Sequence, residues 1–397
     1  MTKLDKLIQE LCPDGVKYLP IPELFITRNG YTPSKANSEF WENGTIPWFR
    51  MEDIRENGRI LTTATQYVSE KAVKGKLFPA DSIIIATSAT IGEHALIKVP
   101  SLANQRFTYL TLKDEFKDCV DMMFVFYYCF RLDEYCKSHL NQGNFASVDM
   151  KQFAAFKFPV PPLPVQCEIV RILDNFTELT AELTAELTAE LTARKQQYAY
   201  YRDKLLTFGD VRGGATSDVV WKTLAEIADI STGSSNTDDA VKGGCYPFFV
   251  RSQQLLAKDE YEYDEEAIIT AGDGVGVGNV FHYINGKYAL HQRAYRIHPA
   301  TDGLLGKYLY HYFVATFPKY IGQQMYQGSV PSIRRPMLNK FQVAIPSLDV
   351  QSRIVNVLDN FDAICTDLSS GLPAEIEARQ KQYEYYRDKL LSFEEKI

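Results

Sequence analysis

Two segments of this chain are near copies of each other. The stretch 163–208 matches the stretch 348–393 without a gap, at a constant offset of 185 residues. Both copies contain the string Tyr-Tyr-Arg-Asp-Lys-Leu-Leu close to their ends, at 200–206 and 385–391. Self-similarity of this length indicates a duplicated structural unit, so the fold must accommodate two equivalent parts.

Each copy has the pattern of a long helix. A strand-like segment with prolines precedes it, at 158–162 and 343–346, and proline ends one element before a helix starts. Apolar residues then recur at helical spacing: Ile169, Leu173, Phe176, Leu179, Leu183, Leu187 and Leu191 in the first copy, and Ile354, Leu358, Phe361, Ile364, Leu368, Leu372 and Ile376 in the second. A helix of about 44 residues is roughly 65 Å long, and its own chain cannot bury such a stripe. The two helices can bury each other, and Gly371-Leu-Pro373 is expected to kink or break the second.

The first copy contains the tetrapeptide Thr-Ala-Glu-Leu three times in tandem, from Thr180 to Leu191. Four residues turn a helix by about 400°, so the leucine stripe drifts by about 40° per repeat in the right-handed sense. The repeat is also what slippage of repetitive DNA would produce, tolerated because Ala, Glu and Leu are good helix formers. The two interpretations are compatible, since a spacer that slips is one whose length can change without unfolding.

Two globular blocks, 1–160 and 213–346, alternate with the helical segments 161–212 and 347–397. The blocks resemble each other weakly: 46–49 matches 246–249, Asn104-Gln-Arg106 matches His291-Gln-Arg293, and 143–147 matches 328–332. The β-branched or alternating runs 82–86, 267–270 and 277–283 are expected to be strands, and 119–140 and 304–324 are expected to be helices. Each block is therefore predicted to be an α+β domain, arranged with a pseudo-two-fold internal repeat.

Composition narrows the class of protein. The net charge of −7 argues at first sight against a nucleic-acid partner, but much of the acidity lies in the helical segments, with 6 basic against 8 acidic and 6 against 10 side chains. The blocks are near neutral, at 19 against 19 and 12 against 13, and each could present a basic face. Seven dispersed cysteines without a Cys-x-x-Cys pair indicate reduced thiols. Without an apolar run long enough for a leader or a membrane span, the chain is expected to be cytoplasmic.

Catalytic and metal-binding motifs are missing, so no catalytic residue and no metal ligand is predicted. There is no His-Glu-x-x-His and no P-loop. The string nearest to an adenine methyltransferase loop, Val160-Pro-Pro-Leu163, has aliphatic residues where a flipped adenine needs a hydrogen bond and a stacking ring. The glycine string 272–278 leads toward a strand, whereas a dinucleotide loop must open a helix. It is interpreted as a strand or loop packed against another backbone, either protein or DNA.

The two blocks, the two near-identical helices, the tandem tetrapeptide and the terminal Tyr-Tyr-Arg-Asp-Lys-Leu-Leu together resemble the DNA-specificity subunits of type I restriction-modification systems. The resemblance covers the whole chain and is greatest to the subclass with Thr-Ala-Glu-Leu spacer repeats. It implies two target-recognition domains held apart by an antiparallel, coiled-coil-like pair of conserved helices. Each domain would read one half-site of a bipartite double-stranded DNA target with a non-specific gap.

The same resemblance implies partners and cofactors. Two modification subunits would supply S-adenosylmethionine and methylate adenine, and restriction or motor subunits would bring ATP and Mg²⁺. The chain itself would hold no cofactor. A solitary methyltransferase or nuclease is excluded by the missing motifs, whereas a bivalent DNA-binding regulator without enzyme partners shares the layout. That alternative leaves the tyrosine-rich helix ends unexplained.

Candidate DNA contacts are polar residues beside apolar runs, because arginine pairs with guanine, and glutamine or asparagine with adenine. In the first block they include the Gly30–Lys35 loop, which resembles a Gly-x-Thr-Pro-Ser loop common in this family. The candidates are Thr32, Ser34, Lys35, Arg50, Asn104, Gln105, Arg106 and Asn144 in the first block, and Arg251, Ser252, His291, Gln292, Arg293, Ser329, Arg334 and Arg335 in the second. For each of them, structural hydrogen bonding is the competing interpretation. Trp41, Trp48 and Phe249 are assigned to the core instead of to base stacking.

The helix ends are rich in tyrosine and arginine on too many faces for the helix pair alone to bury. Both residue types are frequent in protein interfaces. The candidate partner-binding residues are Tyr198, Tyr200, Tyr201 and Arg202 in the first copy and Tyr383, Tyr385, Tyr386 and Arg387 in the second. Packing within the helix pair is the alternative role for the same residues.

Overall fold

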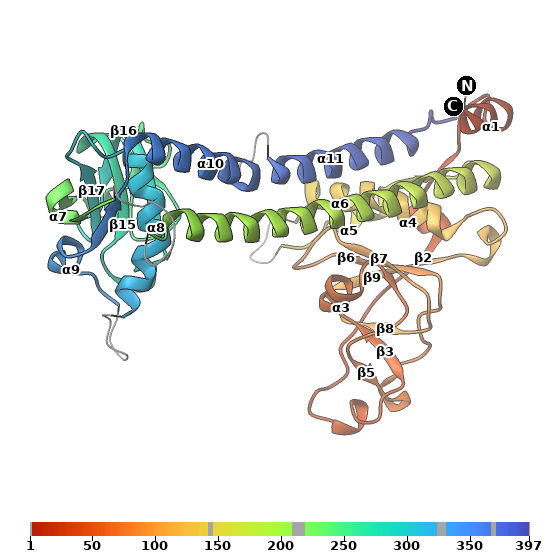
Figure 1. The fold of residues 1–397 in the computed structure, drawn as a ribbon. Coiled ribbons are helices and arrows are strands. Elements are labelled where there is room, and N and C mark those ends of the chain that lie inside the picture. The colour runs from red at the N-terminus through yellow and green to blue at the C-terminus, as the bar shows by residue number, and fades with distance from the viewer. Residues whose placement is uncertain (1, 142–145, 209–218, 324–330, 367–370, 397) are drawn as a thin grey trace. The chain divides into compact units, whose positions relative to one another are not determined.

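The computed structural model describes residues 2–141, 146–208, 219–323, 331–366 and 371–396. The chain forms two compact units: unit 1 contains residues 1–184 and 378–397, and unit 2 contains residues 185–377. Each unit combines one globular block with a part of both helical segments, and the unit boundaries fall inside the helices. Both units mix helices with sheets (Figure 1), which confirms the predicted α+β class.

Unit 1 is built around a five-stranded sheet of order β2-β9-β6-β7-β4 and a three-stranded sheet of order β5-β3-β8. Its strands are β1 Tyr18–Pro20, β2 Phe25–Asn29, β3 Ile46–Phe49, β4 Ile60–Leu61, β5 Tyr67–Val68, β6 Ser82–Ala86, β7 His94–Ile97, β8 Leu102–Ala103, β9 Phe107–Leu112 and β10 Lys157–Pro159. Its helices are α1 Lys3–Leu11, α2 Ile21–Leu24, α3 Met51–Asn57, α4 Met122–Ser138 and α5 Met150–Ala155, with the short 3₁₀ turns η1 Ser38–Phe40, η2 Glu70–Ala72 and η3 Asp114–Phe116. Strand β6 is buried along its whole length and α4 packs against it, as its β-branched sequence predicts.

Unit 2 is built around a six-stranded sheet of order β12-β17-β15-β16-β13-β14. Its strands are β11 Val220–Thr223, β12 Ala228–Thr232, β13 Tyr246–Phe249, β14 Leu256–Lys258, β15 Tyr263–Ala271, β16 Phe281–Leu290, β17 Ala294–Pro299 and β18 Gln342–Ile345. Its block helices are α7 Leu224–Ile227, α8 Gly306–Gly322 and α9 Arg335–Asn339, with the turns η4 Thr237–Asp239 and η5 Gly274–Gly276. Residues 267–270 lie in β15 as predicted. The prediction for 277–283 is wrong over its first half, because a 3₁₀ turn delays the start of β16 to Phe281.

The two helical segments differ in continuity. The first copy forms one unbroken helix, α6 Leu163–Leu206, whereas the second forms α10 Leu348–Thr366 and α11 Leu372–Leu390. Pro373 is the second residue of α11, where a missing backbone N–H costs nothing. Gly371 of the predicted Gly371-Leu-Pro373 site lies outside both helices, so the second copy is not one continuous helix.

Corresponding residues of both helical copies close the core of each block. Ile169 and Leu173 of α6 pack into the core of unit 1 together with Leu391, and Ile354, Leu358 and Leu206 occupy the same repeat positions in the core of unit 2. Each block is thus sealed by the start of one copy and the end of the other. The leucine stripe between these anchors is unevenly buried: Leu179 is 61% exposed and Leu187 is 7% exposed. A drift of about 40° per tetrapeptide explains this change, because it rotates successive leucines toward or away from the neighbouring helix.

A buried glutamine fixes each helix start to its block. Gln166 accepts from the backbone N–H of Asp121 at 2.8 Å and donates to the carbonyls of Cys119 at 2.8 Å and Pro161 at 2.6 Å. The equivalent Gln351 bonds the N–H of Leu305 and the carbonyls of Gly303 and Pro346 in the same way. A side chain without these groups would leave buried backbone groups unpaired, at about 1 kcal/mol or more each. The repeat therefore extends to single hydrogen bonds.

A histidine lies at the junction of α8 and α10 in unit 2. His311 is buried, its Nε2 lies 2.9 Å from Asp359 Oδ1, and its Nδ1 has no hydrogen-bond partner among the described residues. Asp359 also bonds Lys307 Nζ at 2.6 Å, and Asp362 and Lys307 contribute to the local field at His311. Burial lowers the pKa of His311 despite the nearby carboxylates. A second proton, on Nδ1, would be buried without an acceptor.

Unit 2 is expected to lose stability as the pH falls from about 7.5 to about 5.5. Burial lowers the pKa of His282, His291 and His311 below the ordinary value of 6.5. The unfolded chain then binds protons first, so the stability is present above pH 6.5 and is lost below it. Thermal unfolding at the two pH values measures the effect, and His311→Gln should reduce the pH dependence. His139→Gln, in unit 1, is the matched control, and an equal reduction in both variants would contradict the assignment.

No helix within the described ranges combines the length and the apolar composition that a membrane crossing requires. In the same ranges, no group of three or more His, Cys, Asp and Glu side chains is arranged to hold a metal ion. All seven cysteines are free thiols.

Candidate nucleic-acid interface

Most of the predicted polar residues of unit 1 lie around one concavity. The Gly30 loop, residues 30–35, meets the polar turn of unit 1, Asn104–Arg106, where the backbone N–H of Tyr31 donates to Ala103 at 2.8 Å and Thr32 Oγ1 bonds Gln105. Between them is a cavity of about 290 Å³, lined by Thr32, Lys35, Trp48, Arg50, Met51, Glu52, Asn104, Gln105 and Arg106. The lining has three cations and one carboxylate, so it favours an anionic ligand.

Backbone packing explains why these residues meet. A Cβ on Gly30 would clash with the carbonyl oxygens of Ala103 and Asn104, so only glycine allows the loop to cross the polar turn this closely. The turn itself is held from below, because the N–H of Asn104 donates to the carbonyl of Phe49 at 3.0 Å. Asn104 Oδ1 in turn accepts from the N–H of Arg106 at 3.0 Å. Gln105 and Arg106 are exposed at the tip of this turn.

Arg50 is fixed at the floor of the cavity. It precedes α3, and its backbone N–H donates to Asp53 Oδ2 at 2.7 Å. Its guanidinium lies 5.9 Å from the ring of Trp48, and its Nε has no hydrogen-bond partner among the described atoms although it is buried. Trp48 is itself buried, as assigned from the sequence. Arg50 Nε lies 3.9 Å from Glu52 Oε2, and the side chain is 29% exposed, so the guanidinium is partly accessible from the cavity.

Unit 2 repeats this backbone frame. A Cβ on Gly233 would clash with Leu290, and the N–H of His291 donates to the carbonyl of Phe249 at 2.9 Å. In the polar turn of unit 2, His291–Arg293, His291 Nδ1 accepts from the N–H of Arg293 at 2.9 Å. His291 thus performs the turn-closing task of Asn104. Since His291 is only 4% exposed, it supports the turn, whereas Gln292 and Arg293 are exposed at its tip.

An aspartate braces two arginines beside the polar turn of unit 2. Asp273 Oδ1 accepts from Arg251 Nη1 at 2.7 Å, and its Oδ2 accepts from Arg293 Nη1 at 3.4 Å. Both guanidinium groups remain partly exposed. Burial and the two arginines lower the pKa of His291, which keeps its ring neutral and able to accept at Nδ1. The arrangement holds two arginine forks on one exposed face, a geometry suited to base edges or phosphates.

The remaining candidates are less tightly tied to these two sites. Ser34 is exposed in the Gly30 loop and does not line the cavity. Ser252 is exposed and its hydroxyl donates to the carbonyl of Gln254 at 3.2 Å. Arg334 and Arg335 are exposed at the start of α9, directly after Ile333, whose N–H donates to the carbonyl of Gly272 at 2.8 Å. Asn144 and Ser329 lie outside the described residues.

The sequence reasoning missed two parts of the unit 2 site. One is the Gly233 loop, residues 233–236, in which Asn236 accepts from Gln292 Nε2 as Thr32 pairs with Gln105 in unit 1. The other is Asp273. The first could have been found by aligning Thr232-Gly-Ser-Ser with Asn29-Gly-Tyr-Thr, which begin at the last residues of the equivalent strands β12 and β2. The second has no sequence signal, because Ser88 is at the corresponding position in unit 1.

The helix ends use their tyrosines in two ways. Tyr201 stacks on Phe361 with ring centroids 5.9 Å apart, and the equivalent Tyr386 lies 6.2 Å from Phe176. Tyr198 and Tyr383 also face the neighbouring helix, Tyr198 at 6.5 Å from the ring of Phe361 and Tyr383 through a 2.9 Å contact with Thr177 Oγ1. In unit 1, the pairs Phe176–Tyr386 and Thr177–Tyr383 advance in opposite chain directions, so α6 and α11 pack antiparallel there. Tyr200 and Tyr385 are 60% and 62% exposed.

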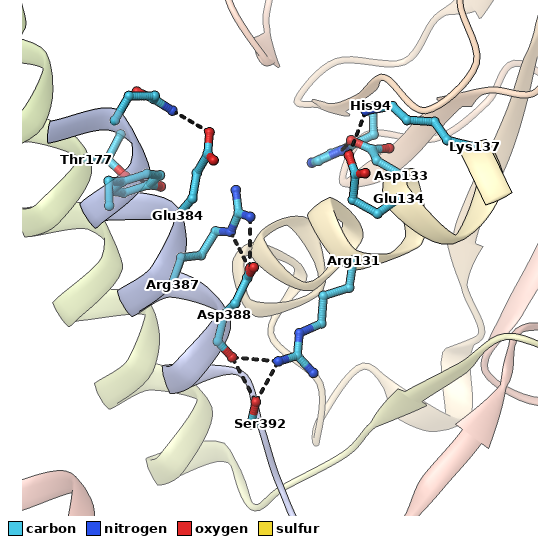
Figure 2. Close-up of polar contacts among 12 residues, drawn as sticks. His94, Arg131, Asp133, Glu134, Lys137, Thr177, Glu384, Arg387, Asp388 and Ser392 are labelled. Atoms are coloured by element: carbon cyan, nitrogen blue, oxygen red, sulfur yellow. Dashed lines mark hydrogen bonds and ion pairs between the residues drawn. The ribbon is translucent and has the colours of Figure 1, made fainter. Parts of the chain in front are cut away.

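The two arginines of the helix ends contact their own units. Arg387 is buried and bonds Asp388 Oδ1 from Nε at 2.9 Å (Figure 2). Its guanidinium also lies 4.3 Å from the ring of Phe130 on α4. Arg131 completes this contact by donating to the carbonyl of Asp388 at 2.6 Å. Arg202 pairs with Asp203 at 2.9 Å and stays partly exposed. Arg387 therefore anchors α11 to α4, whereas Tyr200 and Tyr385 are the most exposed tyrosines of the helix ends.

Comparison with known proteins gives a consistent result. The family model for the type I restriction modification DNA specificity domain matches residues 13–193 and again 216–378. The chain is 43% identical over 386 residues to the type I restriction enzyme EcoprrI specificity subunit of Escherichia coli, covering 93% of this chain and 92% of that protein. It is 34% identical over 284 residues to the Escherichia coli EcoR124I/EcoR124II specificity subunit, covering 64% and 68%.

Solved structures share the fold. A chain described under complex assembly and conformational transition of the type I R-M system has a TM-score of 0.69 at 15% identity, covering 96% of this chain and 98% of that chain. The HsdS subunit from Thermoanaerobacter tengcongensis has a TM-score of 0.57 at 15% identity, covering 96% and 97%. This chain belongs to the type I restriction-modification DNA specificity family. Its role in that family is recognition and not catalysis.

Proposed function

We propose that this chain directs a type I restriction-modification complex to a bipartite double-stranded DNA target, each block reading one half-site on either side of a non-specific gap. The observation that carries the proposal is the same polar turn in the same backbone frame in both units. Each turn presents a Gln-Arg pair, Gln105-Arg106 or Gln292-Arg293, at an exposed tip. Glutamine suits adenine, and arginine suits guanine, in the major groove. Blocks 1–160 and 213–346 would be the target-recognition domains, and 161–212 and 347–397 the spacer.

The proposal extends to partners. The chain would bind two modification subunits, which hold S-adenosylmethionine, and restriction or motor subunits, which use ATP and Mg²⁺. The tandem Thr-Ala-Glu-Leu motif supports assignment to the subclass with a tetrapeptide spacer. The exposed Tyr200 and Tyr385 support a docking role for the helix ends, because they lie at equivalent positions of a duplicated surface and would serve two identical partners.

The decisive experiment is to express the chain with and without its modification partner and to map methylated adenines across the host genome. Methylation confined to one bipartite motif, and only when both proteins are present, is the expected result. Adenine methylation by the chain alone would contradict it. Sequence-specific binding at two half-sites with no dependence of any methylation on this chain would instead favour a bivalent DNA-binding regulator.

Replacing Tyr200 and Tyr385 together with alanine is expected to weaken assembly with the modification subunits by about tenfold or more. Exposed tyrosines on a duplicated surface are typical interface hot spots, and losing one costs about 1–2 kcal/mol of binding. Stability should change little, since both side chains are exposed. Titration of the purified chain with its modification partner, together with a thermal unfolding curve, measures both quantities.

Two further variants sharpen the result. Tyr261→Ala removes an exposed tyrosine of unit 2 outside the helical segments and should leave assembly unchanged. Tyr201→Ala removes the stack on Phe361 and should lower stability more than the paired variant does. Unchanged assembly in a folded Tyr200→Ala, Tyr385→Ala chain would assign the helix ends to packing alone.

A further inference from the structure

A valine is fully presented to solvent beside the arginines of unit 2. Val275 lies at the tip of the finger loop, residues 272–278, and is 95% exposed. Among the other large apolar side chains of the described chain, the most exposed, Tyr385, reaches 62%. An isolated exposed valine is unremarkable on a mobile surface. This valine is on a loop that the backbone holds in place.

The finger loop contacts the backbone of both Arg251 and Arg293. The N–H of Gly272 donates to the carbonyl of Arg293 at 2.8 Å. On the other side, a Cβ on Gly276 would clash with the carbonyl oxygen of Arg251, so glycine is required for this approach. Gly274 has φ +79°, the left-handed conformation that favours glycine, and its N–H donates to Pro331 at 2.9 Å. The loop therefore has a defined position relative to both arginines.

The side chains of the same loop reinforce this placement. Asp273, two residues before Val275, binds Arg251 at 2.7 Å and Arg293 at 3.4 Å. Val275 is thus two residues from the carboxylate that holds both guanidinium groups, and these groups remain partly exposed. No apolar partner for it exists among the described residues. In the major groove of DNA the apolar group offered at a base edge is the C5 methyl of thymine.

Unit 1 has the same loop with a different tip. The N–H of Thr87 donates to the carbonyl of Arg106 at 2.9 Å, as Gly272 does to Arg293, and Ala89 has φ +64° at the position of Gly274. The bridges Ser88–Ser147 and Asp273–Ser332 also correspond. The position of Val275 is taken by Thr90, which is half-buried. An exposed apolar tip is therefore a property of unit 2 and not of the scaffold.

We propose that Val275 is a specificity-determining residue that contacts the C5 methyl of a thymine in the half-site read by unit 2. The inference rests on the proposed DNA-reading function and adds one base identity to it. The contact lies beside those of Arg251 and Arg293, so the thymine is within a base pair or two of the position those arginines contact. Burial of the isopropyl group against the methyl excludes water from both.

Replacing thymine by uracil in the DNA target tests the contact, because it removes the methyl and nothing else. The assembled complex with its modification subunits is measured on duplexes carrying the mapped target, with each thymine of the unit 2 half-site replaced in turn. Wild type should bind about fivefold more weakly at one position. Val275→Ser, which removes both methyl groups of valine, should lose a similar factor on the thymine duplex and show no further loss on the uracil duplex.

The control variant is Val220→Ser, at an exposed valine on β11, which pairs with β18 and not with the finger loop. It should retain the full sensitivity to uracil. The proposal is overturned if no thymine in that half-site is sensitive to its methyl, or if the losses from Val275→Ser and from uracil multiply. A failure of the proposed DNA-reading function would give another result. Wild type would then show no preference for the target, and Arg293→Glu would not change the affinity for DNA.

Discussion

Arg293→Glu is expected to reduce affinity for the half-site read by unit 2 by at least about 100-fold, and Arg106→Glu to do the same for the half-site read by unit 1. Each arginine is exposed at the tip of a polar turn whose backbone is fixed by two hydrogen bonds. The substitution removes a contact worth about 1–3 kcal/mol and places a negative charge against DNA. For Arg293, it also places a carboxylate next to Asp273, which should add to the loss.

Binding of the assembled complex to duplexes with either half-site scrambled measures the two effects separately. Arg353→Glu, which reverses the charge of an exposed arginine on α10, is the control and should change affinity only slightly. Each variant should become insensitive to scrambling of its own half-site and remain sensitive to the other. If both variants lose discrimination at the same half-site, the assignment of one half-site to each block is wrong.

Deleting Thr188–Leu191 is expected to shorten the non-specific gap by one base pair and to leave both half-sites unchanged, so the original target is no longer methylated. Helix α6 runs unbroken through residues 163–206 and has residues in both units. Four residues account for about 6 Å of helix length and a net rotation of about 40°. Because α10 and α11 keep their length, the two helical segments would share the length difference, and the two blocks would approach each other by about 3 Å. One base pair of DNA occupies about 3.4 Å of the helix axis.

Methylation mapping of the deletion variant provides the measurement. The deletion removes one whole tetrapeptide, so the remaining leucines of the repeat keep their four-residue spacing. The chain should therefore still fold. Substituting Thr188, Glu190 and Leu191 by alanine is the matched control, since it keeps the helix length and should keep the original gap. An unaltered gap after the deletion, or a changed half-site sequence, would show that helix length does not set the spacing.

The sequence predicted those parts of the fold that depend on repetition and periodicity. The duplicated helices, the proline-containing strands before them and the buried run at 82–86 follow from patterns of local sequence. The start of β16 was placed too early because Val277 and Val280 look like strand residues, whereas the turn at Gly274–Gly276 is set by contacts with Arg251 and Pro331. Such contacts join residues distant in sequence and leave no periodic signal.

The candidate site was predictable to the extent that it is duplicated. Arg106 and Arg293 stand out because each follows a glutamine in equivalent positions. The sequence did not show whether Asn104 and His291 contact bases or close the turn. An asparagine and a histidine close the same turn here through different acceptor atoms, so the two positions share no residue type that would indicate this role. The sequence suggested a partner-binding role for Arg387, but the side chain is buried in unit 1 against the ring of Phe130. The brace at Asp273 depends on the fold alone.

The aromatic contacts of the helix ends have a consequence for symmetry. Phe176 meets Tyr386 in unit 1, and Tyr201 meets Phe361 in unit 2, so each helical copy supplies one partner to each contact. A chain half as long, with one block and one such helix, would carry both partners and could associate with its twin as an isologous homodimer. Such a homodimer would be limited to palindromic half-sites. Fusing the two halves into one polypeptide removes that limit, because each block can then diverge alone and the target can become asymmetric.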